Sequence, residues 1–323
     1  MRPATAVRAV AGLALSALFL WLVLRGVDLR LAFGELRGAN AAFVVPAAVV
    51  LMTGIWLRAV RWQIILRPLG KVRISHSFSA LTIGYMANNA LPARLGELVR
   101  VYVLNRDSRL PSAAILGSIV LERILDVITL LLLLALAAAL SGWNSPWTGP
   151  LVGLGAAAAL ALAVVYMWAA GLLERLVPVA ASLRPFAGLF GGLPARMLGS
   201  FATGLKMASS PRALGLTLAV SAISWTVEAC LYFLVMLAMG IGQEGFWLAV
   251  LVACVTNLAG VIPAGPGNLG TFEFFAKQTA VLFGVPEEKA LAFALAAHVM
   301  VLAPPTIIGF ALAWQRGFSN LRA

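Results

Sequence analysis

The stretch VIPAGPGNLGTFEFF, residues 261–275, places two prolines, three glycines and a glutamate between almost wholly apolar flanks. Proline and glycine interrupt helices, and backbone groups freed deep in a membrane are tolerated only when buried in protein or lining a polar cavity. A similar stretch, NALPARLGELVR, occupies residues 89–100. We interpret both stretches as the tips of broken helices inside a membrane, not as loops in water.

The composition indicates a polytopic all-α membrane protein. The 323 residues are 62% hydrophobic and 11% charged, whereas soluble domains carry about 25% charged residues. Apolar residues gather in runs of about 20, which cross a hydrocarbon core about 30 Å thick. The net charge of +12 does not indicate nucleic-acid binding, because the excess Lys and Arg lie in short loops between apolar runs. Cys230 and Cys254 lie in apolar segments and have no metal-type spacing.

Six full spans and two shorter interrupted segments are expected. The full spans are residues 5–25, 41–62, 113–140, 150–170, 213–240 and 290–313. The first ends in Arg25 without a small-residue cleavage site, so we expect it to be retained. If segments 75–105 and 246–284 are re-entrant hairpins, sixteen basic residues share the side of both termini and four lie opposite. The positive-inside rule then places both termini in the cytoplasm.

The same topology makes the chain an inverted repeat within one membrane domain. Residues 1–140 and 141–323 each read span, span, hairpin, span, and three crossings per half orient the halves oppositely. Pro92 aligns with Pro266 and Gly96 with Gly270. Inverted repeats whose broken helices meet near the midplane are typical of transporters. Segment 171–212, rich in basic and apolar residues, is predicted to form cytoplasmic interfacial helices.

Ionisable residues inside the bilayer are costly and are therefore functional candidates. They are Arg94, Glu97, Arg100, Glu122, Arg123, Asp126, Glu228, Glu273, Lys277 and His298. The interrupted backbone adds Asn89, Pro92, Gly96, Asn257, Pro263, Pro266, Gly267 and Gly270 to the expected substrate site. Arg94, Glu97 and Arg100 are spaced by three, and the N-terminus of the returning half-helix beside them suits an anion such as a phosphate. A simpler explanation is that both arginines anchor the hairpin mouth, with Glu97 as their partner.

Each of the other candidates also has both a functional and a structural interpretation. Glu122, Arg123 and Asp126 share one span and form either a polar wall of a substrate cavity or a structural ion network. Glu273 and Lys277, four residues apart, form either part of the site or an internal ion pair. Glu228 is a proton carrier or head-group contact, or a hydrogen-bonding partner of another helix. His298, alone among Ala and Val, is best explained as a hydrogen-bonded core histidine.

The motifs resemble the transmembrane domain of the lysylphosphatidylglycerol synthase/flippase family. The resemblance rests on Pro92–Arg100, Glu122–Asp126 and Pro263–Glu273, in that order. It implies a bacterial inner-membrane protein that moves polar-headed lipids between leaflets. No synthase domain follows the last span of this sequence, so we do not carry the synthase activity over. The lipid is also left open, because stand-alone members of the family include handlers of polyprenyl-phosphate-linked sugars.

Three functions follow as hypotheses. The first is a lipid flippase or scramblase, the second a secondary transporter of a small anion, and the third a membrane transferase acting on a lipid-linked sugar, with Glu97 or Asp126 as general base. The sequence contains no nucleotide-binding, hydrolase or metalloprotease motif, so we expect a transporter without cofactor or metal. Membrane lipids are the expected partners, and a homodimer is left open. A lateral opening between helices would favour a lipid over a soluble anion.

Overall fold

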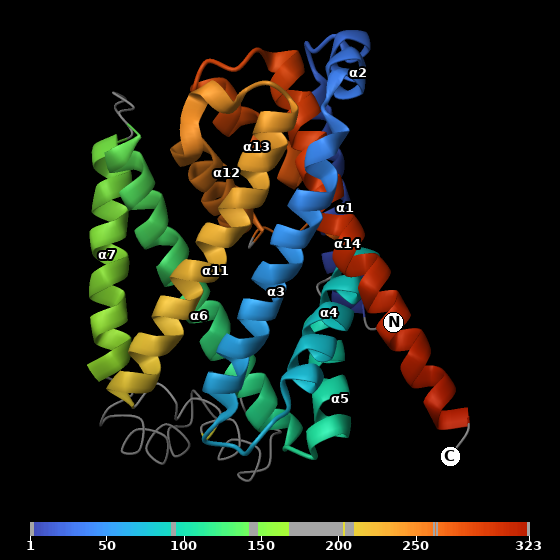
Figure 1. Ribbon diagram of the computed structural model, residues 1–323, viewed down its shortest axis with the longest axis vertical. Helices are drawn as coiled ribbons and strands as arrows, with labels where there is room; N and C mark the ends of the chain where they lie inside the picture. The colour runs from blue at the N-terminus through green and yellow to red at the C-terminus, as the bar shows by residue number, and fades with distance from the viewer. Residues whose placement is uncertain are drawn as a thin grey trace.

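The computed structural model describes residues 3–91, 95–141, 148–167, 203, 210–260, 262 and 264–321. These residues form helices without any strand (Figure 1). The α-helices are α1 (Pro3–Leu24), α2 (Leu29–Gly38), α3 (Val44–Leu66), α4 (Ile74–Ala90), α5 (Gly96–Ser108), α6 (Ser112–Leu140), α7 (Thr148–Met167), α11 (Pro211–Ala238), α12 (Gly245–Ala259), α13 (Thr271–Leu282) and α14 (Glu287–Leu321). Three short 3₁₀ turns are η1 (Ala41–Phe43), η5 (Gly242–Glu244) and η6 (Pro266–Asn268).

Four of the helical segments are long and apolar enough to cross a membrane: residues 41–66, 112–140, 211–238 and 287–317. They coincide with four of the six predicted spans. The other two predictions, 5–25 and 150–170, fall on helices α1 and α7. The protein is therefore an all-helical, multi-pass membrane protein, as predicted. Most of the predicted interfacial segment 171–212 lies outside the described residues.

Helix α2 was not predicted, and its origin is local. Asp28 caps it, because the Oδ1 atom accepts hydrogen bonds from the backbone N–H groups of Arg30 (2.8 Å) and Leu31 (3.2 Å). The helix then rests against α14. It closes the upper end of the bundle in Figure 1.

Two pairs of short helices occupy opposite ends of the molecule. In Figure 1 the pair α4–α5 fills part of the lower half and the pair α12–α13 part of the upper half. Their tips meet beside α14: a Cβ atom on Gly267 would lie 3.8 Å from the carbonyl oxygen of Asn89 and 3.5 Å from Leu302. Asn89 also donates a hydrogen bond to Thr306 Oγ1 of α14 (2.8 Å). The interrupted stretches of the two halves are therefore neighbours in space.

The buried apolar residues form an upper and a lower cluster with charged residues between them. On α3, Ile55 belongs to the upper cluster and Ala59 to the lower one, and Arg58 lies between the two. On α6, Leu125 is in the lower cluster and Leu130 in the upper one, and Asp126 lies between them. The fold thus places a polar layer across the middle of the bundle.

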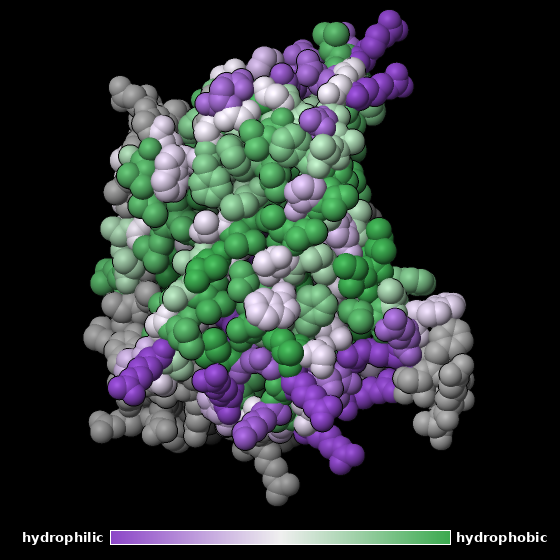
Figure 2. Space-filling model, viewed as in Figure 1, coloured by the Kyte–Doolittle hydropathy of each residue, from purple (hydrophilic) through white to green (hydrophobic). Residues whose placement is uncertain are grey.

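The surface has an apolar belt and two polar ends (Figure 2). Among the described loop and helix-end residues, the lower end carries Arg67, Lys71, Arg73, Arg106, Arg109, Arg212 and Arg316 against Asp107. The upper end carries Arg25, Arg30, Arg37 and Lys289 against Asp28, Glu35, Glu244, Glu287 and Glu288. The lower end is therefore strongly basic, while acidic residues outnumber basic ones by one at the upper end.

Candidate functional site

Seven charged side chains from four helices meet between the two apolar clusters, and we call them the polar layer. They are Arg58, Arg61, Arg100, Glu122, Arg123, Asp126 and Glu228. All are almost fully buried except Arg123, whose side chain is 40% exposed. Ionised groups in such surroundings persist only when they are paired and hydrogen-bonded.

Glu122 is the centre of the polar layer because three arginines converge on it. Its two carboxylate oxygens lie 3.1 Å from Arg61, 2.7 Å from Arg100 and 2.8 Å from Arg123. One turn further along α6, Asp126 pairs with Arg61 and lies 3.2 Å from Arg123. Glu122, Arg123 and Asp126, which the sequence analysis grouped on one span, therefore contact one another as part of a larger ion network.

The polar layer also includes side chains from the second half of the chain, residues 141–323. Glu228 of α11 pairs with Arg58 and accepts a hydrogen bond from the Asn257 side chain of α12 (2.8 Å). Trp225, one turn before Glu228, donates its indole N–H to Asp126 (3.1 Å), and its ring lies 4.3 Å below the Arg58 guanidinium. The layer thus ties α3 and α6 to α11 and α12.

The polar layer carries more cation than anion. Four guanidinium groups face three carboxylates, which leaves a formal surplus of one positive charge. The Nε–H groups of Arg61, Arg100 and Arg123 are buried and find no acceptor among the described residues. A surplus charge together with unused N–H donors is suited to an anionic oxygen, such as that of a phosphate.

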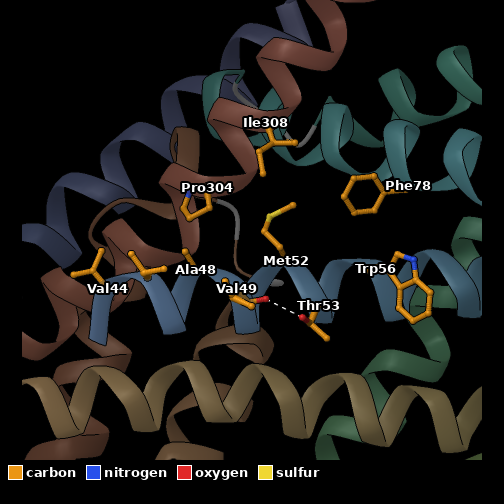
Figure 3. Close-up of a pocket in the computed structure, with 10 residues that line it drawn as sticks. Val44, Ala48, Val49, Met52, Thr53, Trp56, Phe78, Pro304 and Ile308 are labelled. Atoms are coloured by element: carbon orange, nitrogen blue, oxygen red, sulfur yellow. Dashed lines mark hydrogen bonds between the residues drawn. The ribbon is translucent and has the colours of Figure 1, made fainter. Parts of the chain in front are cut away.

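An apolar groove opens on the surface between α3 and α14 (Figure 3). Its volume is about 560 Å³, and Val45 and Val49 on its rim are 70% and 60% exposed. The remaining lining residues are Val44, Ala48, Met52, Thr53, Trp56, Phe78, Pro304 and Ile308. Pro304 and Pro305 interrupt α14 here, and prolines inside a helix bend it; the lower part of α14 leans away from the bundle in Figure 1.

A second buried polar cluster lies at the tip of the α12–α13 pair. Glu273 accepts a hydrogen bond from the Gly270 N–H (2.7 Å) and contacts His298 Nδ1 (2.6 Å). The other ring nitrogen of His298 lies 2.8 Å from the carbonyl oxygen of Gly267. The side chain of Lys277 points elsewhere, toward Glu287 (2.8 Å) and the carbonyl oxygen of Val23 (3.3 Å).

The sequence model of the family described as the lysylphosphatidylglycerol synthase TM region matches residues 9–309. The chain belongs to this family. It is 30% identical over 333 residues to a protein of Haloferax volcanii named glycosyltransferase AglD, covering 93% of this chain and 53% of that protein. A UPF0104 membrane protein of Methanothermobacter thermautotrophicus is 30% identical over 96 residues, 30% of this chain and 28% of that protein. The chain thus spans about half or less of the curated relatives it matches.

Most of the family motif residues that the structure describes lie in the polar layer or at the paired tips. Asn89, Gly96, Asn257, Pro266, Gly267 and Gly270 are placed at helix ends or loops around these two regions. Gly96 packs against Gly84 of α4, with its N–H donated to Asn88 Oδ1 (2.8 Å). Pro92, Arg94 and Pro263 lie outside the described residues. No group of metal-binding side chains occurs in the described part of the chain.

Two partnerships that the sequence left open as alternatives, Glu273 with Lys277 and Glu97 with Arg100, do not form. Glu273 does not pair with Lys277, because His298 and Glu287 offer the two side chains better-placed partners from α14. Glu97 does not pair with Arg100, because Arg100 turns toward Glu122; half-buried Glu97 makes no hydrogen bond or ion pair with the described residues. His298 is hydrogen-bonded, as predicted, but it belongs to the same cluster as Glu273.

The sequence interpretation missed Arg58 and Arg61, which it counted as cytoplasmic loop charges. Both lie inside α3 and are buried in the polar layer. Their spacing of three residues within an otherwise apolar run, followed directly by Trp62, was the available signal. Ser221 on α11, which accepts a hydrogen bond from Arg61 (2.7 Å), carries no such signal.

Proposed function

We propose that this protein is a transporter that moves a polar-headed lipid with an anionic phosphate between the two leaflets of a membrane. The observation that carries the proposal is that the polar layer and a laterally open apolar groove share helix α3. Arg58 of the polar layer and groove-lining Trp56 lie two residues apart there, at nearly the same depth but on opposite faces of the helix. A molecule with a charged head and an apolar tail matches both surfaces at once.

The head-group would bind the polar layer. The surplus positive charge and the three unused Nε–H donors complement a phosphate. Partly exposed Arg123 is the guanidinium that a head-group would meet first. The carboxylates of Glu122, Asp126 and Glu228 would contact cationic or hydroxylated parts of the head-group, so a zwitterionic or glycosylated lipid fits better than a simple anion.

The groove supports a lipid substrate over a small soluble anion. Its lining residues are almost all apolar, and they belong mainly to two membrane-spanning helices. An acyl or polyprenyl chain in the groove makes favourable dispersion contacts with the apolar side chains that line it. A soluble anion would gain nothing from such a groove.

We interpret α4–α5 and α12–α13 as oppositely oriented re-entrant hairpins of an inverted repeat. The packing of the helices supports this reading: α4 lies against α14 and α12 against α6, while α3 and α11, the equivalent helices of the two halves, pack on each other. The basic lower end supports our proposal that both termini lie in the cytoplasm. We propose the bacterial inner membrane as the location, as the family resemblance implies.

A lipid-linked sugar is a specific candidate for the cargo. The name of the Haloferax relative describes transfer of a sugar, and a polyprenyl-phosphate sugar combines the phosphate, hydroxyls and long apolar chain to which the site is suited. A second function, a membrane transferase for such a lipid, is favoured by that name alone. Purified protein given a labelled lipid-linked sugar distinguishes the two, because a transferase changes the lipid and a transporter only relocates it.

The proposal is tested in liposomes that contain head-group-labelled phospholipids or polyprenyl-phosphate lipids. We expect protein-dependent movement between leaflets, reduced about tenfold or more by Arg123→Ala, since one charge-assisted interaction with a phosphate contributes about 1.5–3 kcal/mol. Ala48→Trp, which fills the groove, should also slow movement. Ile223→Trp on α11, another exposed membrane-facing position, is the matched control and should not. Absence of movement for every lipid of both classes would refute the function.

A further inference from the structure

We propose that Glu273 and His298 form a proton-binding site, and that the bound proton holds the tip of the α12–α13 pair against α14. This inference goes beyond lipid movement and concerns its source of energy. Coupling of the proton to transport rests on the proposed function, but the proton site itself does not. The argument begins with a count of donors and acceptors.

The imidazole of His298 lies between two acceptors. Nδ1 is 2.6 Å from a carboxylate oxygen of Glu273, and Nε2 is 2.8 Å from the carbonyl oxygen of Gly267. A carbonyl oxygen and an ionised carboxylate only accept hydrogen bonds, and a neutral imidazole has only one N–H. Both contacts therefore require one proton more than an ionised Glu273 and a neutral His298 possess. Whether it resides on the ring or on the carboxyl, the pair holds it.

The surroundings keep this proton away from water. The side chains of His298 and Glu273 are each 4% exposed. Phe272 stacks on the imidazole with a centroid distance of 4.3 Å, and Tyr232 of α11 in turn stacks on Phe272 with a centroid distance of 6.3 Å. Because the two groups interact so closely, the proton is bound or released by the pair as a whole and not by either residue alone.

Other titratable groups around the pair are already occupied. On α13, Lys277 binds Glu287 of α14 and the carbonyl oxygen of Val23 of α1. The hydroxyl group of Tyr232 contacts Thr256 of α12 (3.3 Å). From α1, the neighbouring polar side chain is Ser16, which accepts the Gly265 N–H (2.7 Å). Among the described residues, no second charged side chain forms a hydrogen bond or ion pair with either His298 or Glu273.

Loss of the proton breaks one of the two contacts. Either the imidazole turns away from Gly267, or the Glu273 oxygen that faces it loses its donor, and only the other oxygen, which accepts the Gly270 N–H, stays hydrogen-bonded. Gly267 lies at the tip that touches Asn89 of the α4–α5 pair. The proton therefore controls whether the tips of the two helix pairs stay together. In this way it affects the contact between the two halves of the molecule.

Histidine NMR tests the proton site without any lipid. The chain contains only His76 and His298, so protein labelled with ¹⁵N-histidine gives two imidazole spin systems, and His76→Gln leaves one. We expect the His298 signals to report Nε2–H and to change in a single step with pH. Glu273→Gln should abolish that step, because an amide permanently supplies the donor that Nδ1 accepts. A step that persists unchanged in Glu273→Gln would overturn the proposal.

Hydrogen exchange measured by mass spectrometry tests the link to the tip. After correction for the intrinsic effect of pH, exchange of residues 264–272 should rise about five- to thirtyfold on deprotonation, the effect of losing one buried hydrogen bond. Glu273→Gln should stay protected at every pH, and His298→Leu should exchange fast at every pH. His76→Gln, in the other helix pair, should behave like wild type. Equal pH dependence in all variants would overturn the proposal.

A pH gradient across the liposomes then separates this proposal from the proposed function. Gradient-dependent lipid movement that disappears in Glu273→Gln supports coupling. Lipid movement that ignores the gradient in wild type refutes coupling while leaving the lipid function intact. A proton site with the expected NMR behaviour in a protein that moves no lipid refutes the lipid function alone.

Discussion

A single carboxylate organises the polar layer. Glu122 receives three guanidinium groups on its two oxygens, and its side chain has no exposure to solvent. Each arginine also has another partner nearby: Arg61 has Asp126, and Arg100 lies over the Trp62 ring at 4.3 Å. The arrangement keeps Arg61 and Arg100 paired in a low-dielectric interior, where an unpaired charge is far more costly than in water.

Replacing Glu122 with Gln should therefore destabilise the protein severely. Two buried arginines and the partly exposed Arg123 would lose the negative charge that they share, and breaking a buried ion pair by removing one partner costs about 3–5 kcal/mol. We expect a fall of roughly 10 °C in the unfolding midpoint of the detergent-solubilised protein. Glu97→Gln is the matched control and should change stability by less than about 0.5 kcal/mol. Equal stability of both variants would show that the polar layer does not depend on this charge.

The acidic residues of the polar layer could be identified from the sequence more readily than the arginines that pair with them. Glu122 and Asp126 stand out in an apolar span and were identified from sequence. Arg58 and Arg61 resemble ordinary positive-inside residues near the end of a span, and only packing against α6 and α11 buries them. Partners separated by many residues, such as Glu273 and His298, depend on how helices cross, and no local pattern encodes that.

The close contact between the short helices α4 and α5 helps to position a residue of the polar layer. Gly84 of α4 and Gly96 of α5 let the two backbones approach so closely that a Cβ on either residue would overlap the other helix. Small residues permit such approach in membranes, where dispersion and hydrogen bonding replace the hydrophobic driving force. Arg100 lies one turn after Gly96, so this contact sets where its guanidinium reaches Glu122.

Gly96→Ala should therefore weaken both stability and the site. The added methyl group would meet the Gly84 carbonyl oxygen and the Asn88 side chain, and such overpacking costs about 1–3 kcal/mol. We expect a lower unfolding midpoint together with slower lipid movement, because α5 must shift and carry Arg100 with it. Gly34→Ala in α2, where a methyl group meets nothing within 4 Å, should leave both measurements unchanged or raise stability slightly. Normal behaviour of Gly96→Ala would contradict the contact.

Most of the helices could be predicted from the sequence, because a long apolar run in a membrane must satisfy its backbone hydrogen bonds internally and therefore forms a helix. Proline and glycine in the two interrupted stretches also placed the breaks between α4 and α5 and between α12 and α13. Helix α2 was not predicted because it is short and its formation depends on the Asp28 cap and on packing against α14. The groove depends on how α14 bends away from α3, which composition does not determine.

In the whole molecule, the contacts between the two halves include the polar layer and the tips of the two helix pairs. The polar layer links α3 and α6 of the first half to α11 and α12 of the second through Glu228 and Asp126. The tips link Asn89 to Gly267 beside α14. A head-group bound at the first contact and a proton bound at the second would both bias the arrangement of the same two halves, which is what coupled transport requires.

The orientation of the helix pairs is the prediction on which this whole-molecule picture depends. Single cysteines would replace Lys71 and Arg109, at the two ends of α4–α5, or Gln243 and Glu288, at the two ends of α12–α13, with Cys230 and Cys254 changed to alanine. An impermeant maleimide added to spheroplasts should label positions 243 and 288 only, because the basic lower end faces the cytoplasm. Positions 71 and 109 should react only after the membrane is opened. Outside labelling of just one residue of either pair would mean that the pair crosses the membrane once, and the two halves would then no longer be inverted copies.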